Sequence, residues 1–325
     1  MARWGLVTTS DPDIGSHAQH HPASPRPLCA RHQGAARGAR VKLRFWGVRG
    51  SIPVPGAQTL RYGGNSSCVE ITAPGAPSLV LDCGTGARAL GLDLLHRPSR
   101  QLIVGFTHFH IDHTLGFPFF VPIYAPSFDV EILLPGHDPA EARGLLMEFL
   151  NGVFHPLRLP DIPAPVRYTS LVPGVARMAG PYLVRTVPLN HPGGACGYRV
   201  EHGGQAIGYF TDSAPMAAPD SGVIAGQAPT EAEARLIAAM TGLDALVFDT
   251  MFTREAYLEH MGWGHSYPEY AVALARAAGV PLLYLFHHAP EAGDDDLDAL
   301  AARWADSHGP VVRVAREGGV VDLEG

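Results

Sequence analysis

One stretch of this sequence decides how the rest is interpreted: Thr107-His108-Phe109-His110-Ile111-Asp112-His113. It follows the apolar run 102–106, which predicts a buried strand, and it precedes 114–116, where we expect a helix to begin. Three imidazoles and one carboxylate therefore lie on a strand-to-helix turn, where side chains can converge on one point. These groups at this density suit Zn²⁺, with Mn²⁺ as a minor alternative. The stretch thus predicts a metal site.

The composition describes a globular protein that can bury a large core. Its 325 residues are enough for one large α/β domain or two small ones, and 46% of them are hydrophobic. No apolar run approaches the roughly 18–20 residues that a membrane span requires, so we expect no membrane partner. The four cysteines show no paired spacing, which argues against disulfides and against a cysteine-rich zinc site. A reducing cytoplasm is therefore the expected location.

Residues 1–40 differ from the rest of the chain. They are rich in Pro, Arg and His, and they lack the apolar core of a secretory signal. We expect a disordered leader here, or untranslated upstream sequence if the true start codon is that of Val41, followed by a single domain over 41–325. Five of the 24 Lys and Arg residues lie in this leader, while the whole chain already has a net charge of −7. The folded part should therefore repel long nucleic acids.

Hydrophobic periodicity and turn residues divide the remainder into strands and helices. Strands dominate each half, and helices come between and after them, which predicts an α/β (α+β) fold. In this four-layer αβ/βα sandwich, two mixed sheets face each other and helices cover the outside. Residues 155–182, rich in proline, are expected to cap the site. The expected strands are 41–48, 67–72, 78–82, 102–106, 131–134, 182–187, 197–202, 205–210, 243–248, 281–286, 311–315 and 319–323. The expected helices are 86–95, 139–150, 230–241, 253–260, 267–278 and 294–307.

Further ligand candidates follow other predicted strands. His191, Asp212 and the pair His287-His288 each stand where a buried strand is expected to end. Strand ends are the usual location of sites in folds built on sheets. Both histidines of the pair remain candidates, and we favour His287 because it continues the strand directly.

The run His108-Phe109-His110-Ile111-Asp112-His113 resembles the H-x-H-x-D-H signature of the metallo-β-lactamase superfamily. The order in which His191, Asp212 and His287 follow it is similar to the ligand series of that superfamily. The resemblance covers about residues 41–300 and implies the sandwich fold given above.

A finer resemblance is to the phosphodiesterase branch, which includes the tRNA 3′-processing endonucleases (tRNase Z) and the phosphoribosyl cyclic-phosphate phosphodiesterases. Leu81-Asp82-Cys83-Gly84-Thr85-Gly86 is similar to the D-x-G-x-G turn of the endonucleases. Gly264-His265-Ser266 resembles their A-x-x-x-x-H-x-T-x-x-x-A segment. The run 246–252 occupies the place of their H-E-A-T motif, with Asp249 where the Glu stands.

The resemblance implies two metal ions, expected to be Zn²⁺ with Mn²⁺ as the alternative. The ligands it implies for the first ion are His108, His110 and His191, and those for the second are Asp112, His113 and His287, with Asp212 bridging. It also implies three catalytic residues. Asp112 would orient or deprotonate the nucleophile, His265 would act as general acid, and Asp249 would hold His265 in the required tautomer.

Arg49 and Asp82 are expected to support the site. The run Gly47-Val48-Arg49-Gly50-Ser51 and the run 61–67 resemble the opening of the phosphodiesterase branch. Arg49 is the nearby charged donor suited to a substrate phosphate. Asp82 is expected to brace the metal loop by accepting backbone or imidazole N–H groups.

The chain also departs from the tRNase Z pattern. The long Gly/Pro-rich arm with which those endonucleases grip tRNA has no counterpart. Asp249 is one methylene shorter than the family's Glu, which puts its reach to His265 in question. His287-His288-Ala289-Pro290 replaces an H-x-S pattern and removes a hydroxyl near the substrate.

These observations favour a dinuclear zinc phosphodiesterase acting on a small or cyclic, nucleotide-type phosphodiester. The first alternative is a lactonase, thioesterase or β-lactamase on the same fold, branches that generally lack the His265 and Asp249 pair. The second is tRNA 3′-end processing, which the absent arm and the acidic charge disfavour. A redox di-iron protein is more distant, because that branch usually has Glu where His110 stands. A homodimer is allowed by these observations.

Overall fold

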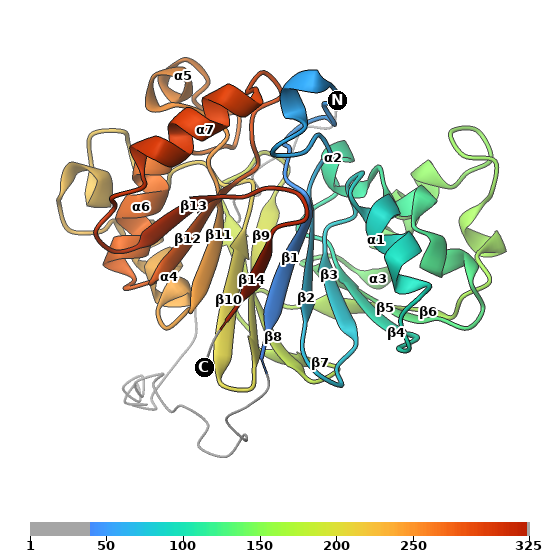
Figure 1. Ribbon diagram of the computed structural model, residues 1–325. Coiled ribbons are helices and arrows are strands. Elements are labelled where there is room, and N and C mark those ends of the chain that lie inside the picture. Colours follow the sequence, from blue (N-terminus) through green and yellow to red (C-terminus); the bar gives the residue numbers. More distant parts are fainter. Residues whose placement is uncertain (1–39, 324–325) are drawn as a thin grey trace, which may run out of the picture. The chain divides into compact units, whose positions relative to one another are not determined.

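Two seven-stranded β-sheets pack face to face in the part of the chain that the computed structural model describes, residues 40–323 (Figure 1). The expected leader lies outside these described residues, apart from residue 40. The first sheet has the order β14-β1-β2-β3-β4-β5-β6 and the second the order β13-β12-β11-β10-β9-β8-β7. Both are mixed, with antiparallel pairing at β1–β3 and β7–β10 and parallel pairing at β3–β6 and β10–β13. The expected fold class is therefore confirmed.

The strands of the first sheet are β1 Lys42–Gly47, β2 Cys68–Thr72, β3 Ser78–Leu81, β4 Gln101–Gly105, β5 Asp129–Pro135, β6 Val166–Leu171 and β14 Val320–Asp322. Those of the second are β7 Arg177–Ala179, β8 Tyr182–Leu189, β9 Ala195–His202, β10 Gln205–Phe210, β11 Ala245–Asp249, β12 Leu282–Phe286 and β13 Val311–Val314. The helices are α1 Ala87–Leu94, α2 Ile111–Thr114, α3 Pro139–Phe149, α4 Glu231–Met240, α5 Arg254–Glu259, α6 Pro268–Ala277 and α7 Asp294–Arg303. Short 3₁₀ turns are η1 Ala57–Thr59, η2 Phe117–Phe119, η3 Val121–Tyr124, η4 Leu159–Asp161 and η5 Gly222–Ala225.

Side chains that point alternately to the two faces of the central strands explain why the fold has helices outside and a core between the sheets. In β3, Leu79 and Leu81 enter the core between the sheets, while Val80 points outward into the core beneath α1 and α3. In β11, Val247 enters the inner core and Leu246 packs outward beneath α4 and α6. Successive side chains of a strand point to opposite faces, so a strand that is apolar throughout must be covered on both sides. The continuous apolar runs of this chain therefore require helices outside each sheet.

The segment expected to cap the site instead extends the sheets. Residues 155–182 contribute β6 to the edge of the first sheet and β7 to the edge of the second. Prolines flank these strands without interrupting them, which obscures their apolar alternation in the sequence. The expectation that this whole segment is an irregular cap was therefore wrong.

One helix start differs from expectation, and the pairing of one expected strand was not predicted. The helix after the first histidines begins at Ile111, inside the motif, because His110 is still extended and Asp112 favours a helix N-terminus. The last strand, β14, leaves the C-terminal half and pairs antiparallel with β1, with Lys42 opposite Asp322. The described helices include none that is long and apolar enough to cross a membrane.

Candidate metal centre

Loops that leave the C-terminal ends of strands from both sheets meet at one end of the sandwich, where α2 and α5 lie (Figure 1). The strand β4 of the first sheet leads into the motif that begins at His108. The second sheet supplies His191 after β8, Asp212 after β10, Asp249 at the end of β11 and His287 after β12. Each side chain therefore sits where a buried strand leaves the core, which fixes its backbone.

The first cluster consists of His108, His110, His191 and Asp212, whose ligand atoms all lie within 4.8 Å of one another. Nε2 of His191 lies 2.9 Å from Nδ1 of His110 and 3.7 Å from Oδ2 of Asp212. Nε2 of His108 lies 3.6 Å from the same carboxylate oxygen. Three imidazoles thus converge on one side of Asp212.

The second cluster consists of Asp112, His113, Asp212 and His287. Nε2 of His113 lies 3.2 Å from Oδ2 of Asp112 and 3.1 Å from Oδ1 of Asp212. Nε2 of His287 lies 3.1 Å and 3.2 Å from the same two oxygens. Asp212 therefore presents Oδ2 to the first cluster and Oδ1 to the second, the arrangement of a bridging carboxylate. All seven residues expected as ligands belong to one of the two clusters.

Asp82 orients the histidines from beneath. Its carboxylate accepts hydrogen bonds from Nδ1 of His113 at 2.7 Å and from the backbone N–H of Thr107 at 2.8 Å. The hydroxyls of Thr107 and Tyr209 also donate to it. Oγ1 of Thr107 lies 3.0 Å from Nδ1 of His108. Asp82 thus fixes which nitrogen of each ring faces the clusters, as the sequence predicted, whereas no pattern in the sequence indicated that Tyr209 takes part.

The donor set fits a pair of divalent cations. Nε2 of His108 and Nε2 of His113 are buried and make no hydrogen bond within the described protein. Burial raises the pKa of Asp112, but His113 and His287 outweigh it and lower the pKa far below the usual range of a carboxyl. Asp212 is buried and its pKa is likewise lowered by His287 and His113 despite burial. Anionic carboxylates and unpaired imidazole nitrogens directed at common points are the ligands that Zn²⁺ prefers.

His265 and Asp249 form a third group with Asp212 and His287, whose ligand atoms also lie within 4.8 Å of one another. Nδ1 of His265 donates to Oδ2 of Asp249 at 2.9 Å. Asp249 is fully buried and also accepts the backbone N–H groups of Ser213 and Met251. Burial lowers the pKa of His265, but Asp249, with smaller contributions from Asp212 and Asp112, raises it to about 9. Asp249 therefore does reach His265 although its side chain is one methylene shorter than that of Glu. The sequence-based question about its reach is answered by this contact.

The adjacent histidines after β12 point to different places. His287 adopts φ of +63° and turns its ring into the second cluster. His288 is buried and its Nε2 donates to the backbone oxygen of Ala315 at 2.7 Å. Burial lowers the pKa of His288 to about 3, so its ring is neutral. Of the two, His287 is the one that the geometry offers as a ligand.

Backbone strain concentrates at this site. The non-glycine residues with positive φ among the described residues are Ser51, Asp82, Asp212 and His287. Three of these belong to the clusters or their support, and Ser51 donates its backbone N–H to Oδ2 of Asp112 at 2.8 Å. Such conformations persist where the surroundings impose them, and they gather at functional sites. Ser51 lies in the run 47–51 that resembles the phosphodiesterase branch, but its backbone contact with Asp112 was not predicted, because backbone conformation carries no side-chain pattern.

Arg49 does not face the centre. Its guanidinium is completely buried and donates to the backbone oxygens of Gly63, Ala289 and Ala292. The expectation that Arg49 binds a substrate phosphate was wrong. Its Nε and Nη1 connect three chain segments instead, while its Nη2 is buried and makes no hydrogen bond within the described residues.

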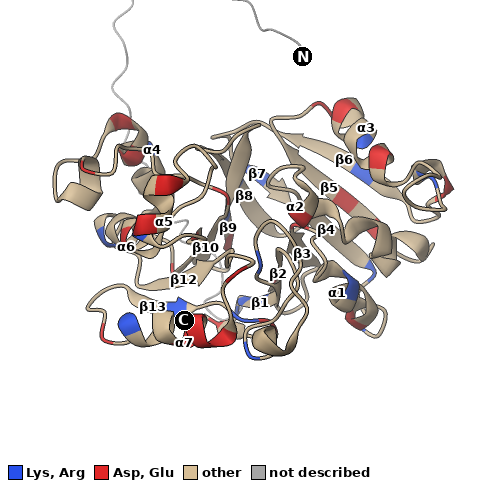
Figure 2. Ribbon diagram, turned by 90° about the horizontal axis from the view of Figure 1, so that it is seen from above, with Lys and Arg blue, Asp and Glu red and all other residues tan. Residues whose placement is uncertain are grey.

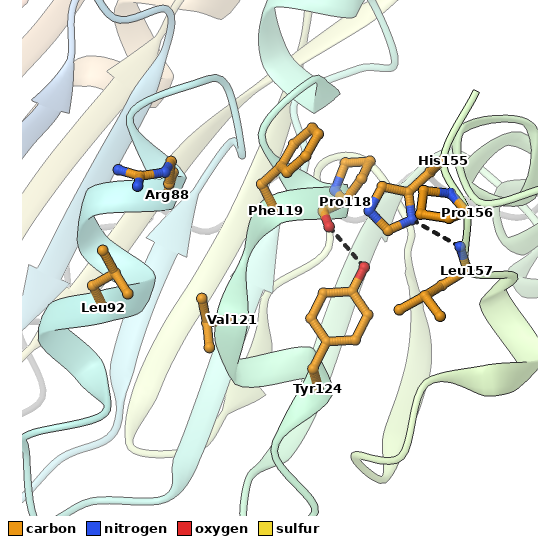
Figure 3. A pocket seen from close by; sticks show the side chains of 9 residues that line it. All are labelled: Arg88, Leu92, Pro118, Phe119, Val121, Tyr124, His155, Pro156 and Leu157. Atoms are coloured by element: carbon orange, nitrogen blue, oxygen red, sulfur yellow. Dashed lines mark hydrogen bonds between the residues drawn. The ribbon is translucent and has the colours of Figure 1, made fainter.

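A surface hollow of about 450 Å³ lies elsewhere, between α1 and the segment around residue 155 (Figure 3). Within it the hydroxyl of Tyr124 donates to the backbone oxygen of Pro118, and Nδ1 of His155 accepts the backbone N–H of Leu157. The residues that line it are Arg88, Leu92, Pro118, Phe119, Val121, Tyr124, His155, Pro156 and Leu157. None of them belongs to either metal cluster, so the hollow and the candidate centre are distinct.

Comparisons with known proteins agree with this geometry. The sequence model of the family described as "Beta-lactamase superfamily domain" matches residues 78–288. No curated protein sequence gives a significant match.

Solved structures share the fold at low sequence identity. The metallo-β-lactamase fold protein YhfI from Bacillus subtilis is 20% identical, with a TM-score of 0.62 over 88% of this chain and 100% of that chain. A diphosphatase from the PhnP family is 17% identical, with a TM-score of 0.60 over 88% and 98%. The short form of human tRNase Z is 16% identical, with a TM-score of 0.62 over 87% and 99%.

Proposed function

The chain belongs to the β-lactamase superfamily, and on this premise we propose that it is a dinuclear metal-dependent phosphodiesterase acting on small or cyclic phosphodiesters. The observation that carries the proposal is the His265–Asp249 pair beside two clusters that share Asp212. Among the proteins of similar fold, one is described as a diphosphatase and another as a tRNase Z, names that fit phosphate-ester chemistry.

The proposed first site comprises His108, His110 and His191, and the second comprises Asp112, His113 and His287, with Asp212 shared. Zinc is the expected metal, because imidazole and carboxylate are the donors that it takes. When bound, a pair of such ions lowers the pKa of a water molecule and neutralises the charge of the phosphoryl oxygens.

Asp112 is the residue that we propose to orient the attacking water. Its Oδ2 accepts the Ser51 N–H and faces His113 and His287, so the carboxylate has little freedom to rotate. A fixed acceptor beside the scissile phosphorus would orient the water for in-line attack, and the proton of the water passes to solvent, because the lowered pKa of Asp112 makes its carboxylate a weak base.

His265 is the proposed general acid. Hydrolysis forms a bond between the water oxygen and phosphorus and breaks the bond to the leaving oxygen, which must gain a proton. The charge of Asp249 keeps His265 protonated at neutral pH and fixes its Nδ1 as a donor to the carboxylate. Nε2 therefore carries the transferable proton, and solvent restores it after each turnover.

A small substrate suits the charges around the site better than a long nucleic acid. Seen from the end where α2 and α7 lie, Lys and Arg are found mostly at the margins (Figure 2). Helix α7 opens with Asp294, Asp295 and Asp296. A polyanion gains affinity from several Lys or Arg contacts to its phosphates, and few are available here. We therefore propose hydrolysis of small phosphodiesters in preference to tRNA processing.

A substrate panel tests the proposal. The metal-loaded protein should hydrolyse bis-p-nitrophenyl phosphate and at least one cyclic mononucleotide or cyclic dinucleotide, with kcat/KM well above that for a lactone or a cephalosporin. A pre-tRNA with a 3′ trailer should be a poor substrate. Turnover of the lactone or the cephalosporin without turnover of any phosphodiester would contradict the proposal and favour the other hydrolase classes.

A further inference from the structure

An exposed tryptophan lies in the loop that passes against the candidate centre, and the proposed mechanism does not use it. Trp263 is 62% exposed and lies two positions before His265 in the loop between α5 and α6. The glycines on either side of it, Gly262 and Gly264, have φ of +90° and +91°. A Cβ on Gly264 would lie 2.2 Å from Nδ1 of His191, so only glycine lets the backbone pass against this ring. The loop that carries Trp263 therefore passes directly against His191, one of the expected ligands.

A series of aromatic contacts links Trp263 to His265. The indole meets His260 edge to face with ring centroids 4.8 Å apart, and His260 stacks on Phe252 at 5.1 Å. Phe252 in turn contacts His265 edge to face at 5.9 Å. Nδ1 of His260 also donates to the backbone oxygen of Ala256 at 2.7 Å, which fixes the middle of the series. The indole is therefore held by its neighbours while most of its surface remains open to solvent.

The loops around the centre present apolar side chains and contain no Lys or Arg. Ile52, 55% exposed, follows Ser51, and Ile111, 56% exposed, stands between two expected ligands. The segments 50–55, 108–116, 189–194, 211–216, 260–266 and 287–292 contain no Lys or Arg. The part of a substrate that lies outside the reacting phosphate would therefore meet apolar and aromatic surface. A second phosphate group would find no Lys or Arg in these loops.

We infer that Trp263 is a specificity-determining residue that stacks on a planar, uncharged ring of the leaving alcohol. The inference rests on the proposed function, in which His265 protonates the leaving oxygen. Trp263 shares the loop of His265, so a group that it contacts lies on the leaving side of the phosphorus. A nucleoside meets both requirements, because its sugar supplies the leaving hydroxyl and its base supplies a ring that stacks on aromatic side chains.

Two substrates that differ only in the base test this inference. Adenosine 2′,3′-cyclic phosphate and methyl ribofuranoside 2,3-cyclic phosphate have the same reacting group, but the second carries a methoxy group in place of adenine. For Trp263→Ala we expect KM for the adenosine substrate to rise roughly 10-fold, which corresponds to about 1.4 kcal/mol of lost stacking. KM for the methyl riboside and both kcat values should stay within about 2-fold of wild type.

Two variants serve as controls. Trp263→Phe keeps an aromatic ring, so it should retain most of the preference for the adenosine substrate. Met178→Ala removes a comparably exposed apolar side chain, 56% exposed, from β7, which Figure 1 shows at the opposite end of the sheets from α5. It should change neither KM. Equal changes in KM for both substrates with Trp263→Ala, or no change for either, would overturn the inference.

A binding measurement separates failure of the inference from failure of the proposed function. If the wild-type protein hydrolyses neither substrate, the proposed function is wrong for this substrate class. Titration with adenosine then decides the role of Trp263 alone. Saturable quenching of tryptophan fluorescence that is present in the wild type and lost in Trp263→Phe would support stacking of a base. Quenching that is absent in the wild type, or unchanged in the variant, would overturn it.

Discussion

Nδ1 of His265 lies 2.9 Å from Oδ2 of Asp249, and this contact divides the candidate centre into two parts. On one side, seven residues converge in two clusters that suit metal ions. On the other, a buried carboxylate holds an imidazole whose pKa is raised to about 9, with its second nitrogen free to act on a substrate. Substitutions in the first part should reduce metal binding, whereas substitutions in the second should reduce the reaction rate and leave metal binding intact.

Replacing His265 should affect chemistry while leaving metal binding intact. For His265→Ala we expect kcat to fall roughly 10²–10⁴-fold, the usual contribution of a general acid. Metal content should match that of the wild type, since His265 lies outside the seven expected ligands. A p-nitrophenyl leaving group needs little protonation, so its hydrolysis should fall much less than that of a ribose ester. Steady-state kinetics on both substrates check this, and equal losses would show that His265 is not the acid.

Asp82 should act on metal affinity through the rings that it holds. Asp82→Asn keeps the size of the side chain but removes the charge facing Nδ1 of His113 and the acceptor shared with Thr107. We expect the metal dissociation constants to rise about 10–100-fold, the usual effect of losing such a supporting contact. Titration of the chelator-treated protein with Zn²⁺ measures this. Unchanged affinity together with lower thermal stability would mean that Asp82 only supports the fold.

The sequence predicted most of the fold and of the candidate centre because both depend on strand ends. Apolar runs identify the buried strands, and His191, Asp212 and His287 come directly after such runs, so their convergence follows from the sheet. The preference for His287 over His288 also came from the strand that His287 continues, but the strand end alone does not show why only one of the two rings enters the cluster. This difference depends on the left-handed turn at His287, which reverses the direction of the next side chain.

Other features depend on contacts that no local pattern records. Arg49 stands in a polar, glycine-rich segment that is typical of an exposed loop, yet carbonyls from distant segments bury it. Tyr209 belongs to a buried strand, and only the packing of β10 against β3 shows that its hydroxyl reaches Asp82. The strands β6 and β7 form at sheet edges, where pairing with a neighbour outweighs a weak apolar alternation.

Arg49 should contribute stability and leave substrate binding unaffected. Arg49→Met keeps an apolar stem but leaves the backbone oxygens of Gly63, Ala289 and Ala292 without their donor. We expect the free energy of unfolding to fall by about 2–4 kcal/mol, because buried acceptors lose their hydrogen bonds. Arg49→Lys keeps the charge without the planar fork and should recover only part of this loss. Denaturant unfolding measures both. A rise in KM for a phosphodiester at unchanged stability would instead indicate a phosphate contact.

Metal content is the most direct prediction about the centre. We expect about two transition-metal ions per chain in active protein, with zinc favoured, as in two-metal hydrolases. Because Asp212 presents one oxygen to each cluster, Asp212→Asn should weaken both sites and leave at most about one ion bound. Chelation of the wild type should abolish activity and lower its melting temperature, since it leaves Asp112 and Asp212 close together without a counter-charge from metal.

Asp220→Asn, which alters an exposed carboxylate, is the matched control and should keep both ions and full activity. Elemental analysis and differential scanning calorimetry on the same preparations provide the measurements. Full activity with one ion or none would remove the dinuclear interpretation. Removing the charge of a bridging carboxylate must lower the affinity for both ions that it joins. Loss of activity in Asp212→Asn with both ions retained would therefore show that Asp212 serves the reaction without bridging.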